Sequence, residues 1–493
     1  MAGGKGATAR RGLTQRSEDF GAWYNEVVLQ AELADYSPVR GSMVIRPWGY
    51  GIWERMQRAL DDMFRETGHE NAYFPLLIPM SFIEREKEHI EGFKPELAVV
   101  THAGGKELEE PYVVRPTSET IIYSMYAKWV QSYRDLPILL NQWANVMRWE
   151  MRTRLFLRTA EFLWQEGHTA HATEAEAEEE AVRILGIYRT FMEAWMAMPP
   201  LTGLKSEAEK FAGAVRSYAC EALMQDRKAL QAGTSHMLGQ NFARQFDLTF
   251  QSEEGREEYA WNTSWGVSTR LVGGLVMTHG DDVGLVVPPK LAPTQVIVLP
   301  IARSDDDWAA VGTVADRVAE ALGCVGVRAK TDRRRHLSPG AKFYEWERKG
   351  VPMRIEVGPR DVAKGQVVAV ARVPDPAGTR KVATEEAAAV AEMPARLDEL
   401  QGRLLEAALS RREAATYRGT VSSVDELAEL LEGGAGFVYT GWSGDPAVEE
   451  RARVAAKASI RVIPDAEFRS DPMPARCIGG GRAQMEVVWA RAY

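Results

Sequence analysis

Apolar residues follow helical and strand spacings in turn along the first 290 residues of the chain. The helical spacing predicts helices over residues 17–34, 47–67, 121–133 and 173–198, and a further helix that begins at Ser268. Strand or hairpin patterns fall at residues 73–79, 100–115, 146–168 and 238–265. Pro75 favours an edge position for its strand, because proline cannot donate a ladder hydrogen bond. That edge, next to a long apolar helix, predicts contact with a second copy of the chain and therefore a homodimer.

A different rhythm begins after the proline-rich boundary at residues 288–293. Strands are expected at 296–301, 325–329, 352–358 and 366–373, and helices at 305–322, 338–349 and 383–410. This alternation is typical of an α/β domain of ordinary size. The remainder contains a helix at 423–432, a strand at 437–439 and a last strand that ends the chain. The sequence thus predicts an α/β (α+β) protein with a flexible tail over 1–16 and domains over 17–290, 291–410 and 411–493.

Composition narrows the class of protein without identifying it. The 493 residues are 45% hydrophobic and 26% charged, which is typical of a soluble globular chain, and no apolar run reaches the roughly 20 residues of a membrane span. The three cysteines are far apart, which excludes a disulfide framework and favours a reducing, cytoplasmic compartment. The net charge of -9 argues against non-specific coating of nucleic acid but permits a local basic patch. The basic residues 1–16 are interpreted as a cytosolic tail in preference to a mitochondrial targeting segment.

The hairpin at 146–168 carries a high density of charge, with four arginines, three glutamates, two tryptophans and a histidine. Side chains two apart on a strand share a face, so Arg148 points with Glu150. On the return strand one face carries Phe162, Trp164, Glu166 and His168, and the tip carries Arg152, Arg154 and Arg158. Charged side chains are seldom buried without partners. The hairpin is therefore either a solvated, salt-bridged face or an anion-binding site.

Three shorter segments carry further candidate chemistry. At the start of a helix, Thr117 or Ser118 is either an N-cap or, with Glu119, part of a site for a substrate ammonium. Residues 231–236 (Q-A-G-T-S-H) are expected to form a compact turn before a strand, in which the histidine is either structural or a ligand contact. In residues 265–274, an arginine follows a serine N-cap, which makes either an ordinary capped helix or an anion site.

These segments together resemble the motifs of the class II aminoacyl-tRNA synthetases. Motif 1 matches the long helix and the strand around Pro75, motif 2 matches Arg148-Trp149-Glu150 with Arg158 to Phe162, and motif 3 matches the string G-V-S-T-R that ends at Arg270. Their order, with T-S-E before motif 2 and G-T-S-H between motifs 2 and 3, is similar to the prolyl-tRNA synthetases of archaeal and eukaryotic-like type. The strings R-P-T-S-E-T, F-L-W-Q-E-G-H and K-G-V-P-M-R-I-E-V-G-P-R-D extend the likeness over nearly the whole chain.

The resemblance implies a fold and a set of site residues. The fold would comprise an antiparallel-sheet catalytic domain, an α/β anticodon-binding domain and a small α/β C-terminal domain. The implied catalytic residues are Arg148 and Arg270, and magnesium would complete the charge balance on ATP. The implied ATP-binding residues are Arg148, Glu150, Arg158, Thr159, Gln231, Thr234 and Arg270. The implied proline-binding residues are Thr117, Glu119, Arg148, Trp164, Glu166, His168, His236 and Ser268.

The resemblance also implies the reaction. The proline carboxylate attacks the α-phosphate of ATP, pyrophosphate leaves, and the terminal ribose hydroxyl of tRNA(Pro) then takes the prolyl group. Such a reaction needs positioning and positive charge but no covalent catalyst. A missing methylene is worth only about 1–3 kcal/mol, so alanine and cysteine are expected to be misactivated to some extent. Only roughly 110 residues separate Phe162 from Arg270, which leaves no room for the editing domain that bacterial-type relatives insert there.

The last two domains carry further implications of the resemblance. The candidates for contacts with anticodon bases are Glu345, Glu347, Arg354 and Glu356. Where relatives hold a structural zinc with four cysteines, this chain has Ser443, Val448, Cys477 and Gly479. One thiolate cannot build a tetrahedral site, so zinc is expected to be absent. Apolar packing is expected to stabilise the domain instead, through Phe437, Tyr439, Val487, Val488 and Trp489, and the terminal Tyr493 is expected to reach back toward the active site.

Two alternatives are left open by the sequence. The first is another class II synthetase, for threonine, histidine or glycine; the T-S-E and F-L-W-Q-E-G-H strings count against it. The second is a catalytically silent paralogue that binds tRNA or regulates a partner. The presence of Arg148, Arg158 and Arg270 counts against the second, because silent paralogues tend to lose these arginines.

Overall fold

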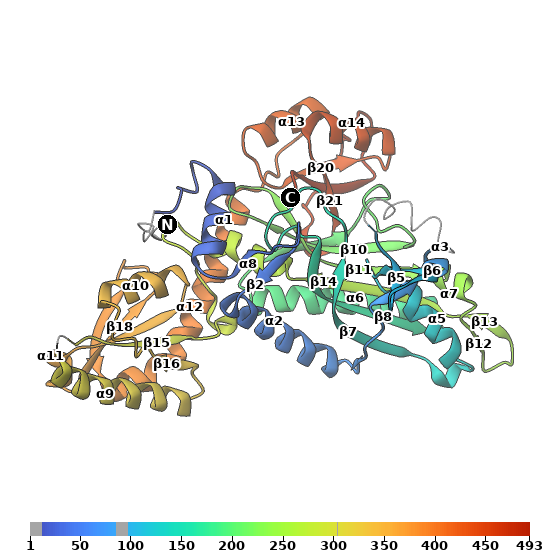
Figure 1. Ribbon diagram of the computed structural model, residues 1–493. Helices are drawn as coiled ribbons and strands as arrows, with labels where there is room; N and C mark the ends of the chain where they lie inside the picture. The colour runs from blue at the N-terminus through green and yellow to red at the C-terminus, as the bar shows by residue number, and fades with distance from the viewer. Residues whose placement is uncertain (1–11, 85–96, 303) are drawn as a thin grey trace, which may run out of the picture. The chain divides into compact units, whose positions relative to one another are not determined.

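A computed structural model describes residues 12–84, 97–302 and 304–493 of the chain (Figure 1). Helices and sheets are mixed, as the sequence pattern predicts. The described chain forms two compact units, each assembled from separate stretches of sequence. The smaller unit contains the described residues up to Asp35, Ile45–Ile52 and Leu275–Leu404; the larger contains Tyr36–Val44, Trp53–Gly274 and Leu405–Tyr493.

The larger unit is built on a ten-stranded sheet that draws strands from distant parts of the sequence. Neighbouring strands are antiparallel except for the last pair, which is parallel. The strand order is β20 (Val438–Trp442), β22 (Met485–Ala490), β21 (Ser459–Pro464), β9 (Pro200–Leu204), β10 (Arg216–Leu223), β11 (Ala229–Gly239), β14 (Trp261–Ser268), β8 (Glu161–His171), β7 (Ile138–Met147) and β3 (Glu70–Asn71).

Helices cover this sheet through apolar faces. Helix α6 (Glu174–Ala194) packs across β10, β11 and β14 and is capped by a reciprocal pair of hydrogen bonds between Thr173 and Glu176. Helices α5 (Glu119–Trp129) and α7 (Asn241–Phe246) pack together in a second apolar cluster. Smaller elements flank them: α3 (Met80–Glu84), the sheet of β4 (Leu77–Pro79), β6 (Lys106–Val114) and β5 (Ala98–Ala103), and the hairpin of β12 (Thr249–Gln251) and β13 (Glu257–Tyr259).

The C-terminal segment belongs to this larger unit. Its helices α13 (Val424–Glu432) and α14 (Pro446–Ala456) pack against each other beside β20 (Figure 1). The five apolar residues expected to pack there, 437, 439 and 487–489, are all buried. Some of them join a cluster with β9 and β10 residues such as Leu201 and Ala219, because the sheet is continuous across the segment.

The smaller unit is an α/β layer with a five-stranded sheet in the order β16 (Ala329–Thr331), β15 (Val296–Pro300), β17 (Met353–Val357), β18 (Gln366–Ala371) and β19 (Lys381–Glu385). The first three strands are parallel, and β18 and β19 turn antiparallel. The apolar face of α9 (Asp305–Cys324) packs on the sheet. The further helices are α1 (Phe20–Gln30), α10 (Pro339–Arg348), α11 (Pro359–Val362) and α12 (Glu386–Ala414).

The elements whose residues fall in the sequence ranges of both units are α2 (Pro47–Glu66), α8 (Arg270–His279), α12, β1 (Ala34–Tyr36) and β2 (Met43–Ile45); β1 and β2 form a two-stranded sheet. None of the helices in the described part of the chain is long and apolar enough to span a membrane.

The structure differs from the sequence-based expectations at residues 231–236 and 1–16, and Arg148 and Glu150 lie in the connection after β7 instead of on a strand. Residues 231–236 were expected as a turn but lie inside β11, where both edges of the backbone pair with β10 and β14. Ladder hydrogen bonds thus override the turn preference of G-T-S. The expected tail over 1–16 is held from Leu13 onward: the Thr14 N–H donates to Glu26 at 2.6 Å and Arg16 pairs with Asp282 at 3.1 Å. Residues 1–11 lie outside the described residues.

Candidate active site

One face of β8, β14 and β11 lines a cavity of about 340 Å³ in the larger unit. The alternating residues of β8 that were expected to share a face, from Phe162 to His168, all line it. Strand register places Glu166, Gly266 and Thr234 in one row across the three strands, and His168, Ser264 and His236 in another. The middle strand contributes small residues to both rows. The longer side chains of the outer strands therefore flank open space.

The sequence-derived proline and ATP candidates converge on this cavity and on a smaller one of about 180 Å³ that shares Arg148, Phe162, Ser268 and Arg270 with it. The larger cavity also holds Thr117, Glu119, Trp164, Glu166, His168, Gln231, Thr234 and His236. The smaller one adds Glu150, Arg158 and Thr159. Segments far apart in sequence thus meet as the motif order predicts.

One end of the larger cavity, which we name the carboxylate pocket, contains Glu119, Glu166 and His168. The Glu166 Oε1 atom accepts hydrogen bonds from Ser118 Oγ at 2.5 Å and from Gln142 Nε2 at 2.7 Å, and Oε2 lies 3.1 Å from His168 Nε2. Thr117 donates to Glu119. The two glutamates are only 3% and 2% exposed. Neutral donors therefore hold two buried carboxylates in fixed orientations, in a pocket suited to a cationic ligand.

The hydroxyl groups of Thr117 and Ser118 do not cap the helix that they precede. Ser118 is the N-cap residue of α5, but its side chain makes no capping hydrogen bond. Both hydroxyls donate to carboxylates instead. Ser118 thus occupies the N-cap position without a capping side-chain hydrogen bond, and both hydroxyls orient carboxylates of the cavity wall.

Gln142 on β7 links the carboxylate pocket to the strand region around Pro75. The Phe74 N–H donates to Gln142 Oε1 at 2.5 Å. Because a peptide N–H can only donate, the amide oxygen faces Phe74 and the NH₂ group faces Glu166. The fully buried Arg115 holds the other side of the same residue, since its Nη1 donates to Phe74 O at 2.7 Å. The backbone of motif 1 is thus fixed to the pocket by two side chains.

The other end of the site, the arginine pocket, contains Arg148, Arg158 and Arg270. Arg148 Nε donates to Pro116 O at 3.0 Å, and its guanidinium lies 5.5 Å and 5.4 Å from the ring centroids of Phe162 and Trp164. Arg158 pairs with Glu150 at 2.9 Å. The two rings and the carbonyl orient the Arg148 guanidinium toward the cavity wall that they share.

Arg270, in the first turn of α8, lies among like charges. Its Nε donates to Leu157 O at 3.2 Å and its Nη1 to Gln231 O at 3.5 Å. Burial, followed by the charges of Arg148 and Arg158, lowers the pKa of Arg270 to about 10. Among the residues that the structure describes, no carboxylate forms an ion pair with it. An anionic ligand would relieve this repulsion, which makes the pocket an anion site.

His236 is oriented by its neighbours on the cavity wall. Its Nδ1 lies 2.8 Å from Ser217 Oγ, and its ring stacks on Phe211 with centroids 4.6 Å apart. The same Ser217 hydroxyl accepts from the Phe211 N–H at 3.0 Å. The histidine is therefore packed and hydrogen-bonded while it still lines the cavity.

Sequence reasoning missed several residues of this site. The cavity wall also contains Lys205, Glu209, Phe211 and Ser217, from the end of β9 to the start of β10. Gln142 stands behind the wall. No motif marks these residues, and neither β9 nor β10 was expected as a strand. Charged and aromatic residues in the 205–211 connection were the only available signal.

The anticodon candidates lie in the smaller unit and are engaged in ion pairs there. Glu345 pairs with Arg334 and with Lys349. The remaining pairs are Glu347 with Arg380 at 2.6 Å, Arg354 with Glu356 at 3.0 Å, and Glu356 with Lys381 at 2.6 Å. Glu347 and Arg354 also border a shallow depression of this unit.

The four positions aligned with zinc ligands do meet in space. Cys477 Sγ lies 3.5 Å from Ser443 Oγ and accepts from the Gly479 N–H at 3.3 Å. A Cβ atom on Gly479 would lie 2.3 Å from Val448 Cγ2. The valine methyl groups thus occupy the room that a side chain at 479 would need.

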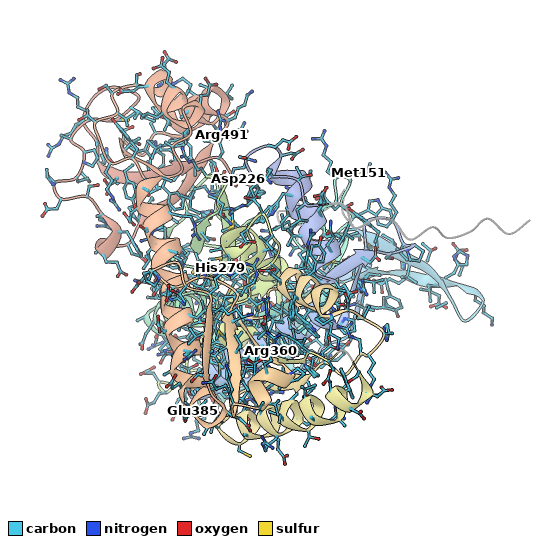
Figure 2. All side chains as sticks on the ribbon, turned by 90° about the vertical axis from the view of Figure 1, so that its left-hand side faces the viewer. Met151, Asp226, His279, Arg360, Glu385 and Arg491 are labelled. Carbon is cyan, nitrogen blue, oxygen red and sulfur yellow. The ribbon has the colours of Figure 1, made fainter. Side chains whose placement is uncertain are left out.

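The chain end approaches the larger unit at the β10–β11 turn. The Arg491 carbonyl accepts from the Ala229 N–H at 2.8 Å, and the Tyr493 N–H donates to Ala229 O at 3.2 Å. Figure 2 labels Arg491 together with Asp226 of this turn. Tyr493 meets the start of β11, although its side chain is not among the residues that line the cavity.

Comparison with known proteins identifies the architecture. Residues 99–279 match the family model of the tRNA synthetase class II core domain (G, H, P, S and T), and residues 295–395 match that of an anticodon-binding domain. The fold is that of a class II tRNA synthetase.

Relatives that match over nearly the full length of the chain show which family of class II synthetases it belongs to. The chain is 55% identical over 487 residues to the proline--tRNA ligase of Chlorobium luteolum, which covers 98% of this chain and 99% of the relative. It is 55% identical over 484 residues to that of Chloroflexus aurantiacus, and 54% identical over 488 residues to that of Roseiflexus castenholzii, again over 98% of this chain and at least 99% of each relative. The chain belongs to the proline--tRNA ligase family.

Proposed function

We propose that this protein activates L-proline with ATP to prolyl adenylate and pyrophosphate, and that it transfers the prolyl group to the 3′ end of tRNA(Pro). The observation that carries this proposal is the meeting of a carboxylate pocket and an arginine pocket in one site. The first suits an ammonium group and the second suits phosphates. An amino acid bound between them would present its carboxylate to a phosphate.

In the activation step, an oxygen of the proline carboxylate bonds to the α-phosphorus while the bond from that phosphorus to the bridging oxygen of pyrophosphate breaks. The carboxylate is already ionised at neutral pH, so the step needs no general base. Arg148 would bind both the α-phosphate and the proline carboxylate, which brings the reacting atoms together. Arg270 would bind the γ-phosphate from the opposite side, where negative charge collects on the leaving group.

The remaining nucleotide contacts are assigned to residues around the arginine pocket. Glu150 and Arg158, which pair with each other, would hold the adenine and γ-phosphate region together with Thr159. Gln231 and Thr234, on β11, would contact the nucleoside. The support for both assignments is their place on the walls of the two cavities.

Proline would bind with its secondary ammonium against the carboxylate pocket. Thr117 and Glu119 are assigned to the ammonium, because their hydrogen bond already orients the carboxylate. The ring would lie among Trp164, Glu166 and His168. The last two assigned residues, His236 and Ser268, line the same cavity. Misactivation of alanine and cysteine is expected, because a hydrophobic pocket gains little from one methylene.

Magnesium fits this site as a partner of the phosphates. Across the described ranges there is no group of three or more candidate metal ligands, and magnesium in nucleotide sites is commonly held by one or two carboxylates and by phosphate oxygens. Glu150 is the carboxylate that borders the arginine pocket. When bound, the ion would offset negative charge on the triphosphate.

The segment between motifs 2 and 3 supports the absence of editing in cis. Residues 172–260 contribute α6, β9, β10, β11, α7, β12 and β13 to the larger unit itself. We assign tRNA anticodon recognition to the smaller unit, with Glu345, Glu347, Arg354 and Glu356 as candidates. Their support is their position within the matched anticodon-binding region.

We infer that the enzyme is a homodimer that works in the cytoplasm. The support for the dimer is the exposed apolar character of the chain after α2, where Tyr73 is 70% exposed and Leu77 is 38% exposed. The cytoplasm is where a tRNA ligase of translation meets its substrates.

We also propose that the C-terminal segment holds no zinc. A single cysteine stands among the four aligned positions, and tetrahedral zinc needs four ligands. Metal analysis of the purified protein is expected to give zinc far below one equivalent, and a chelator is expected to leave the melting temperature unchanged. One equivalent of zinc that resists dialysis would overturn this proposal.

The decisive test of the activity is amino-acid-dependent exchange between ATP and labelled pyrophosphate. Proline is expected to support exchange, and threonine, histidine and glycine are not. Exchange with one of those three and not with proline would replace the substrate assignment. The absence of exchange with all four would favour the silent paralogue.

A further inference from the structure

The C-terminal segment, residues 405–493, is hydrogen-bonded to β9, the strand that leads into the cavity wall. Strand β21 pairs with β9 at Ile463↔Leu204 and Pro464↔Gly203. A Cβ atom on Gly203 would lie 2.2 Å from Ile463 O, so only glycine permits this approach. Thr202 Oγ1 donates to Asp465 Oδ2 at 2.6 Å, and the Asp465 N–H donates back to Thr202 O at 3.1 Å.

Two residues that follow β9 are linked to the same segment, Lys205 through Glu221 on β10 and Ser206 directly. Glu221 on β10, which is fully buried, accepts from Lys205 Nζ at 2.8 Å and from both Nε and Nη2 of Arg461, at 3.0 Å and 2.8 Å. This fork between guanidinium and carboxylate fixes direction as well as distance. Ser206 Oγ donates to Glu449 Oε1 on α14 at 2.6 Å.

The chain enters the cavity wall directly after these anchors. Lys205, Glu209 and Phe211 line the cavity, and Arg461 Nη1 lies 3.9 Å from Glu209 Oε2. Phe211 is fixed at its own end by Ser217 and by its stacking on His236. The connection 205–211 is therefore held at its start by the C-terminal segment and at its end by β10 and β11.

We propose that Arg461, Asp465 and Glu449 are positioning residues for amino-acid recognition, an inference that rests on the proposed function for its substrate. They hold residues 202–206, which keeps Glu209 and Phe211 at the wall of the cavity. None of the three lines the cavity itself. The C-terminal segment thus shapes the amino-acid site without lining the cavity itself.

The test is an Arg461→Met variant of the full chain, assayed by exchange with proline and with ATP varied in turn. A displaced wall changes the surroundings of His236 in the amino-acid site, whereas Arg148 and Arg270 keep their hydrogen bonds to Pro116 O and Leu157 O. KM for proline is therefore expected to rise by about tenfold or more, with KM for ATP within about twofold of the wild type. Arg461→Lys keeps the positive charge but loses the two-pronged hydrogen bonding of the guanidinium. Its KM for proline is expected to lie between those of the wild type and Arg461→Met.

A second measurement is independent of catalysis. Release of the connection is expected to speed tryptic cleavage after Lys210 in Arg461→Met. The matched control is Arg453→Met in the same segment: Arg453 forms a surface ion pair with Glu450 on its own helix, and its side chain is 55% exposed. This control is expected to match the wild type in both assays.

Loss of a buried ion-pair partner can also unfold a protein, so Ser206→Ala provides a gentler variant with the same expected split of KM values. A folded Arg461→Met variant with wild-type KM for proline and wild-type cleavage would overturn the inference, and so would an equal rise of both KM values. If the wild type exchanges with a different amino acid, the substrate assignment fails, and the same comparison made with that amino acid still tests the role of Arg461.

Discussion

The carboxylate pocket and the arginine pocket are carried by neighbouring strands but hold their charges in different ways. In the first, Glu166 accepts from two neutral side chains and Glu119 from a third. In the second, Arg148 and Arg270 donate to backbone carbonyls, and burial, followed by the charges of Arg148 and Arg158, lowers the pKa of Arg270. The first pocket is preorganised by its protein partners, whereas in the second no carboxylate of the described residues forms an ion pair with Arg270, whose charge a phosphate would offset. The first is thus built for selectivity and the second for strong binding of phosphate.

Removal of Arg148 is expected to give the largest effect. Arg148→Ala takes away the cation assigned to the reacting carboxylate and α-phosphate. Loss of one donor that stabilises a transition state typically costs about 10²–10³ in kcat, and exchange is expected to fall at least that far. Arg152→Ala, at an exposed position of the same loop, serves as the control. Full exchange activity in Arg148→Ala would contradict the mechanism and revive the silent paralogue.

Gln142→Leu tests the carboxylate pocket through a residue that holds Glu166 but does not line the cavity. The change leaves the buried Phe74 N–H without its acceptor, which costs about 1–3 kcal/mol of stability, and removes one donor from Glu166. Because hydrogen bonds to charged groups contribute about 1.5–3 kcal/mol, KM for proline is expected to rise about tenfold or more while KM for ATP stays the same. Steady-state exchange and thermal melting measure both effects. Equal changes in the two KM values would mean that the two pockets are not independent.

Arg270→Lys tests the arginine pocket through the pH dependence of activity. Lysine has an ordinary pKa of about 10.4, below that of arginine, and the burial and neighbouring charges that lower the pKa of Arg270 to about 10 would lower that of a lysine further. Binding of phosphate needs the protonated form, so activity is lost as pH rises through the lowered pKa. The variant is expected to lose kcat/KM for ATP at a lower pH than the wild type does. Parallel pH profiles would contradict this account of the arginine pocket.

Ionic strength is expected to give the smallest difference between the two pockets, measured as KM for ATP and KM for proline. Salt screens exposed charges over about 10 Å at 0.1 M, and the arginine pocket opens to solvent. KM for ATP is expected to rise about threefold between about 0.05 M and 0.3 M salt at constant free magnesium, with little change in KM for proline. An equal response of both substrates would show that the contrast in neutralisation has no consequence for binding.

The spacing of apolar and polar residues along the sequence predicted much of the fold and many of the side chains that line the cavity. The period-two face of β8 places four of its side chains in the cavity, and the helix predicted from Ser268, which begins at Arg270 in the structure, brings that arginine to it. Both follow from residues close in sequence, whose relative directions are set by strand and helix geometry. The family resemblance, confirmed over nearly the full length, joined these pieces into one site.

The residues behind the site could not be predicted in this way. Gln142 is joined to Phe74 and Glu166, which are distant in sequence, and a glutamine on a strand gives no sign of its partners. Strand β9 has little strand propensity because it contains Pro200 and Gly203. It becomes a strand by pairing with β10 and β21 on its two sides. Information of this kind lies in tertiary contacts and not in local spacing.

The continuity of the sheet from β9 to β21 has a consequence for how the enzyme is made. A ribosome delivers β9 more than 250 residues before the strand that covers its outer edge. During that interval the edge has unpaired peptide groups, a condition that invites pairing with other chains. A nascent chain stopped before residue 459 would carry every motif of the active site and still lack one side of its scaffold. The ten-stranded sheet can therefore be completed only after the ribosome has synthesised β21.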